Sequence, residues 1–112
     1  MPKARVQNRV VVAQGFKEEY QAAKASNSDI QGNLTIFNKY KREVPPKALP
    51  AEMKDHKLSG RLKAYRECHL APDVLLLYKS KGGTFKLLGI CNHADLHGPK
   101  EKALAKKLKG RG

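Results

Sequence analysis

The chain contains little cysteine and no long apolar run. Its two cysteines, Cys68 and Cys91, are too few for a disulfide framework, and we interpret them as reduced thiols that pack as small buried hydrophobic residues. No apolar stretch approaches the length of a membrane-spanning helix, and the start MPKARVQNRVVVAQ has too short an apolar stretch for a signal peptide. We therefore expect a cytoplasmic protein without a membrane partner.

Acidic residues are also scarce. Aspartate and glutamate number 10 against 23 lysines and arginines, which leaves a net charge of +13 on 112 residues. A charge of this size on a short chain indicates a polyanionic partner, with nucleic acid the leading candidate and an acidic protein the second. The length fits one compact domain.

The first half of the chain predicts one strand and two helices. Residues 8–13 (NRVVVA) have the β-branched run of a strand, and residues 15–26 place apolar side chains at helical intervals. Residues 26–43 continue the helical spacing until the proline pair at 45–46 prevents further helix. We expect the two helices to be antiparallel across a short turn at Asn27.

The second half predicts a long loop and three strands. Residues 44–60 contain three prolines and read as a loop. Residues 61–70 alternate as a strand, residues 74–79 are continuously apolar as in a strand covered on both faces, and residues 84–92 form the last strand after a KSKGG turn. The tail, residues 99–112, is compatible with a short basic helix or a disordered basic arm.

Histidines gather on these strands and their connections. His56 lies in the long loop, His69 in the first of the three strands, and His93 just after the last, while Asp73 follows His69 by four residues. An imidazole has an ordinary pKa near 6.5, so it can act as acid or base at cell pH. Each residue alone also has a plain interpretation, as a surface, strand or turn residue.

The order of the stretches DHKLSG, YRECHLAPD, LLLYK and CNHADL resembles that of the RelE/ParE toxin superfamily, and within it the YafQ-type mRNA interferases. The resemblance runs from about Val10 to Gly98. It implies an α+β fold of order β-α-α-β-β-β, with an antiparallel-rich twisted sheet and a helical hairpin on one face. Residues 1–98 would be the toxin domain and residues 99–112 a basic extension.

The resemblance also implies an enzyme. YafQ-type toxins bind the ribosomal A site and cut messenger RNA there without a metal or cofactor, and an antitoxin inhibits them. Such cleavage uses the ribose 2′-OH as nucleophile, with an acid, a base and cations around the transition state. We expect His93 to be the general acid. His56, His69 and Asp73 would supply the base and stabilise the transition state, without a division of these roles among them. The catalytic set implied by the resemblance is His56, His69, Asp73 and His93. For contacts to RNA and the ribosome we expect Lys54, Lys57, Arg61, Lys63, Arg66, Lys86 and His97.

Three positions depart from the family pattern. Val74 replaces an aromatic residue after the acid, Gly89 replaces an arginine before the last histidine, and His97 replaces an aromatic residue after it. Val74 and Gly89 favour a second hypothesis, a non-catalytic basic binding protein on the same fold, either a degenerate toxin or a ParE-like protein with a different target. A metal site is a further alternative without a familiar zinc spacing. Its ligands would be Cys91, His93, His97 and His69.

Overall fold

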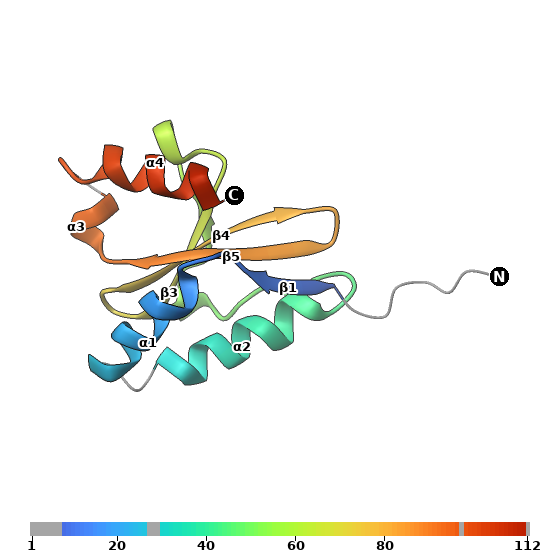
Figure 1. Cartoon of the computed structure of the whole chain (residues 1–112). Helices are drawn as coiled ribbons and strands as arrows, with labels where there is room; N and C mark the ends of the chain where they lie inside the picture. Colours follow the sequence, from blue (N-terminus) through green and yellow to red (C-terminus); the bar gives the residue numbers. More distant parts are fainter. Residues whose placement is uncertain (1–7, 27–29, 97, 112) are drawn as a thin grey trace.

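The computed structural model describes residues 8–26, 30–96 and 98–111. Its centre is one five-stranded sheet of strand order β1-β5-β4-β3-β2, in which β1 runs parallel to β5 and the other neighbours are antiparallel (Figure 1). The strands are β1 (Arg9–Val12), β2 (His56–Lys57), β3 (Arg66–Ala71), β4 (Val74–Lys81) and β5 (Thr84–Cys91).

Helices cover both faces of this sheet (Figure 1). The helical hairpin α1–α2 lies on one face and α4 on the other, so the predicted α+β arrangement is confirmed. The expected turn at Asn27 lies outside the described residues. The helices are α1 (Phe16–Ser26), α2 (Ile30–Arg42), α3 (His93–Leu96) and α4 (Glu101–Arg111), with short 3-10 helices η1 (Ala51–Met53) and η2 (Gly60–Leu62).

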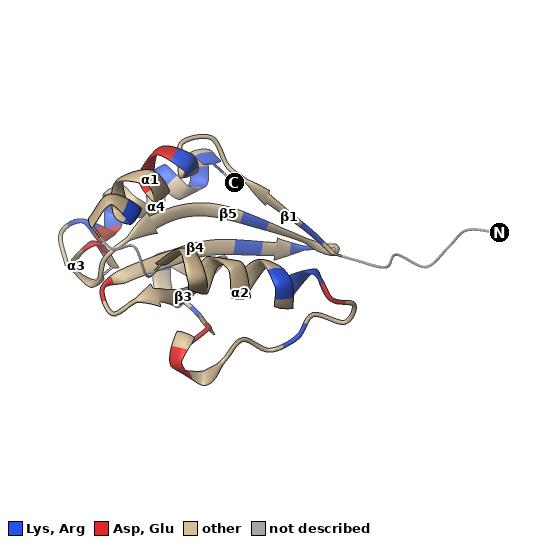
Figure 2. Ribbon diagram, turned by 90° about the horizontal axis from the view of Figure 1, so that it is seen from below, with Lys and Arg blue, Asp and Glu red and all other residues tan. Residues whose placement is uncertain are grey.

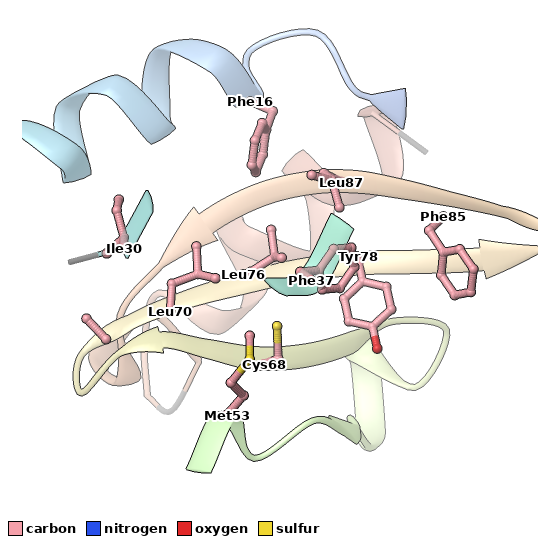
Figure 3. Close-up of a cluster of buried hydrophobic side chains, with 11 residues drawn as sticks. Phe16, Ile30, Phe37, Met53, Cys68, Leu70, Leu76, Tyr78, Phe85 and Leu87 are labelled. Atoms are coloured by element: carbon pink, nitrogen blue, oxygen red, sulfur yellow. The ribbon is translucent and has the colours of Figure 1, made fainter. Parts of the chain in front are cut away.

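The first core cluster lies between the sheet and the α1–α2 hairpin (Figure 3). Phe37 of α2 packs edge-to-face on Tyr78 of β4, with 4.9 Å between ring centroids. Cys68 is buried in the same cluster. Because the apolar side chains of α1 and α2 recur at helical intervals, each helix turns one stripe toward the sheet.

The second core cluster lies on the opposite face, under α4. Leu104 and Leu108 of α4 are buried against Leu75 and Leu77 of β4. β4 is therefore covered on both faces, as its continuous apolar run predicts. The sequence left the tail open between a short basic helix and a disordered arm; residues 101–111 form the helix α4.

Two details of the sequence prediction are wrong. The strand expected over 61–70 begins only at Arg66, because Gly60 has a positive φ of 62° and starts the turn of η2. Ala64 is consequently exposed, whereas Tyr65 is buried in the second cluster. The expected loop over 44–60 contains β2, a strand of two residues that is too short to leave a sequence pattern.

In the part of the chain that the structure describes, no helix combines the length and apolar character needed to cross a membrane.

Candidate active site

Asp55 anchors the segment that carries His56. Its carboxylate accepts hydrogen bonds from Lys41 Nζ at 3.1 Å, from the Tyr78 hydroxyl at 2.5 Å and from Arg66 Nε at 3.4 Å. Burial alone would raise the pKa of Asp55, but these donors outweigh it and hold the pKa below its ordinary value. Because the donors come from α2, β3 and β4, this Asp55 network ties the loop to the sheet one residue before His56.

Glu67 is a buried carboxylate between two of the expected catalytic histidines. It lies opposite His56 in the β2–β3 pair, and its side chain is 4% exposed. Its Oε1 is 3.0 Å from Nε2 of His69, and its Oε2 is 3.6 Å from Nε2 of His56. Glu67 is not among the candidate site residues predicted from the sequence. The available signal was its i, i+2 spacing to His69, which puts both side chains on one face of a strand.

The two nitrogens of the His56 ring face different acceptors. Nδ1 is 2.7 Å from the carbonyl oxygen of Lys54, and Nε2 faces Glu67. A doubly protonated ring can donate to both. His56 thus lies between a backbone carbonyl and the Glu67 carboxylate, at the rim of the site.

His93 is held by Asp73. One carboxylate oxygen of Asp73 accepts the backbone N–H of His93 at 3.0 Å and lies 2.8 Å from Nδ1 of the ring. The backbone hydrogen bond, followed by the ring hydrogen bond, holds the pKa of Asp73 below its ordinary value. An ionised Asp73 fixes Nδ1–H as the donor and leaves Nε2 of His93 for another partner.

His69 and His93 face each other in one cavity. Their ring centroids are 5.3 Å apart and the rings meet edge-to-face. Both line a cavity of about 410 Å³, whose further polar lining comes from Asn33, Glu52 and Lys54. Thus β3 and the start of α3 bring together two imidazoles, each with its own carboxylate.

The expected RNA contacts fall in several places. Lys54 lines the cavity, and the exposed Lys57 and Lys63 line a separate hollow beside β2. Arg61, on η2, forms an ion pair with Glu101 of α4 at 3.3 Å.

Two further expected contacts lie outside the cavity. Arg66 belongs to the Asp55 network. Lys86 faces Lys79 across the β4–β5 pair, in the basic region toward the hairpin of these strands (Figure 2). His97 lies outside the described residues.

The departures at Val74 and Gly89 have a structural context. Val74 packs against the first core cluster. A Cβ atom at Gly89 would lie 3.1 Å from Oε1 of Glu19 and 3.3 Å from Nη1 of Arg111. The small residue at position 89 therefore leaves space into which α1 and α4 bring charged side chains.

A possible metal-ligand set differs from the one considered on the sequence. Among the described residues, Glu67, His69 and His93 place ligand atoms within 4.8 Å of one another. Two imidazoles and a carboxylate are ligands that zinc or copper accepts. Cys91 is instead buried in the second cluster, where burial raises the pKa of its thiol to about 12.

A mixed five-stranded sheet with a helical hairpin on one face is the fold of YafQ-type toxins. The Escherichia coli DinJ-YafQ toxin–antitoxin complex contains a similar structure, with a TM-score of 0.64 and 25% identity over 83% of this chain and 100% of that chain. A metal-bound toxin from Helicobacter pylori has a TM-score of 0.65 and 27% identity over 80% of this chain and 99% of that chain.

The family model for the bacterial toxin of type II toxin-antitoxin systems, YafQ, matches residues 8–98. The chain belongs to this family, as its sequence resemblance predicts. It is also 42% identical over 50 residues to the mRNA interferase toxin YafQ of Escherichia coli strain K12, a match that covers 45% of this chain and 54% of that protein. The chain thus spans about half the length of the curated relatives it matches. Helix α4 lies beyond the residues that match the family.

Proposed function

We propose that this protein is an endoribonuclease toxin, an mRNA interferase that cuts messenger RNA in the ribosomal A site by metal-free acid–base catalysis. A cognate antitoxin would neutralise it in the cytoplasm, as the partnership named for the DinJ-YafQ relative suggests. The observation that carries this proposal is the pair His69 and His93, whose rings line one cavity. Each ring has a nitrogen in contact with a carboxylate, His69 with Glu67 and His93 with Asp73.

In this proposal His93 is the general acid. With Nδ1–H bound to Asp73, the protonated ring presents Nε2–H to the 5′ oxygen that leaves as the P–O5′ bond breaks. Asp73 stabilises the imidazolium ring that gives up this proton. The carboxylate itself keeps its charge throughout the step.

His69 serves as the base. Its Nε2 lies at the carboxylate of Glu67, so Nδ1 is the nitrogen that accepts the proton from the 2′-OH. The 2′ oxygen attacks phosphorus, and the product upstream of the cut is a 2′,3′-cyclic phosphate. Glu67 is a positioning residue for both His69 and His56.

Positive groups around the cavity stabilise the charge that develops on the phosphate. Lys54 lines the cavity, and His56 lies on the other side of Glu67 with 52% of its side chain exposed. Fixed cations aimed at a developing negative charge lower the barrier without reorganisation during the step. The net charge of +13 supports binding to ribosomal RNA and messenger RNA together.

Cell-free translation with the protein added, followed by mapping of the mRNA ends, tests the proposal. The wild type should cut mRNA only on ribosomes and leave a 2′,3′-cyclic phosphate. His93→Ala should slow single-turnover cleavage by about 10²- to 10⁴-fold with ribosome binding little changed, because an acid acts only as the bond breaks. Lys39→Ala, an exposed change on α2, is the control and should cut at the wild-type rate.

Three outcomes would contradict the proposal. Equal rates for the wild type and His93→Ala would remove His93 from the catalytic set. A 3′-hydroxyl end would show attack by water. Tight ribosome binding without cleavage by the wild type would favour the non-catalytic binding protein that Val74 and Gly89 suggest.

A further inference from the structure

A large open groove lies between η2 and α4, apart from the cavity of His69 and His93. Its volume is about 740 Å³. Arg61 and Tyr65 line it from the η2 segment. From α4 it is lined by Lys102, Lys106 and Lys109, together with small apolar residues.

The three α4 lysines form one charged stripe. They recur at i, i+4 and i+7, so they lie on the same face of the helix. All three are exposed, and the ion pairs found within residues 8–26, 30–96 and 98–111 include none of them. Like charges at this spacing destabilise a helix, so the stripe contributes nothing favourable to folding. An anion bound in the groove would relieve the repulsion.

Two other basic residues of α4, Lys107 and Arg111, contact the rest of the protein. Lys107 and Arg111 form ion pairs with Glu19 of α1 at 2.9 and 2.8 Å, and Arg111 also donates to the carbonyl oxygen of Leu88 at 2.9 Å. These contacts dock the helix on the sheet. The groove lysines are thus presented on a fixed support, separate from the residues that hold it.

The groove adjoins a second cationic hollow beside β2. Tyr65 lines both this groove and the hollow formed with Lys57 and Lys63. Lys57 directly follows His56 on β2. A cationic lining therefore extends from α4, across η2, to the strand that carries a candidate catalytic histidine. An extended track of this kind fits a polymer with one negative charge per unit better than a small anion or a short acidic peptide.

We propose that the groove between η2 and α4 binds the phosphate backbone of RNA and extends the active cleft beyond the segment that is cut. The proposal rests on the proposed function for its choice of RNA as the polyanion. The three lysines lie outside residues 8–98, so α4 adds this stripe to the part that matches the family, which itself contributes Arg61 and Tyr65 to the groove.

The test is the salt dependence of RNA binding, measured by fluorescence anisotropy. The probe is a labelled 2′-O-methyl oligouridylate, which has no free 2′-OH and therefore cannot be cut by the proposed mechanism. Three glutamines replace the groove lysines, because glutamine keeps the helix propensity and removes the charge. The variant combines Lys102→Gln, Lys106→Gln and Lys109→Gln. A control on α1 and α2 loses the same charge through Lys17→Gln, Lys24→Gln and Lys39→Gln.

The groove variant should have a shallower slope of log affinity against log salt, by about 2, since each lost contact to a single strand changes the slope by about 0.7. Between about 50 and 200 mM salt the wild type should therefore lose roughly 20-fold more affinity than this variant. The control variant should keep the wild-type slope. Circular dichroism melting should show that both variants fold like the wild type, because all the replaced lysines are at least partly exposed.

Equal slopes for the two variants would overturn the proposal. So would a groove variant that binds RNA normally but loses affinity for a co-expressed acidic partner, since the groove would then be a protein-binding site. A failure of the proposed function has a different signature. The wild type would not cut mRNA on ribosomes, whereas the difference in RNA binding between the two variants would persist.

Discussion

Leu108→Ala tests whether α4 is part of the folded core. The Leu108 side chain is fully buried, and its Cδ2 would lie 3.7 Å from a Cβ atom at Gly89. It packs in the second cluster with Leu75 and Leu77 of the central strand. Shortening this side chain leaves a cavity between α4 and the sheet.

The expected loss follows from the burial. Leucine-to-alanine changes in cores cost about 2–5 kcal/mol, depending on how well the surroundings collapse. Leu104 and the ion pair between Arg111 and Glu19 continue to hold α4 in place, which limits that collapse, so we expect the free energy of unfolding to fall by about 3 kcal/mol. With an unfolding entropy of about 2.1 cal/mol/K per residue, the melting temperature should fall by roughly 10–15 °C.

Urea unfolding followed by circular dichroism measures this free energy. Lys109→Ala is the matched control, because Lys109 is the next residue on α4 but is exposed, and its change should stay within about 0.5 kcal/mol. A cost below about 1 kcal/mol for Leu108→Ala would refute the reasoning and make α4 a detachable arm. If the prediction is right, deleting residues 98–112 would expose the second core cluster to solvent. The effect of the α4 charge on RNA binding should therefore be tested by substituting its exposed lysines, because this leaves the core intact.

Two further predictions concern acid stability and metals. Since the folded-state pKa of Asp55 is lowered, its contribution to stability is present above its unfolded pKa of about 4 and is lost as pH falls through the folded value. Asp55→Asn should therefore cost about 2 kcal/mol at pH near 7 in urea unfolding and progressively less below pH of about 4, and a pH-independent cost would contradict this assignment. For metals, protein treated with EDTA and assayed on ribosomes with magnesium restored should cut mRNA at the untreated rate. Loss of cleavage that only zinc or copper reverses would replace the metal-free mechanism with a site at Glu67, His69 and His93.

Local patterns in the sequence determined most of the elements. Apolar spacing predicted α1 and α2, and the apolar run at 74–79 predicted a central strand covered on both faces. These predictions succeed because each depends on which face of a single element becomes buried. The motif order likewise indicated the family and selected four candidate residues, of which His69 and His93 share a cavity.

Tertiary structure decided the relations between elements. Pairing of β2 with β3 places Glu67 opposite His56, a relation that depends on strand register and not on the spacing of either segment. The docking of α4 likewise brings Arg111 close to Gly89 of β5, where a Cβ atom would lie 3.3 Å from the Arg111 guanidinium. Periodicity specifies which residues share a face of one element. Which residues of another element meet that face is decided only when the chain packs.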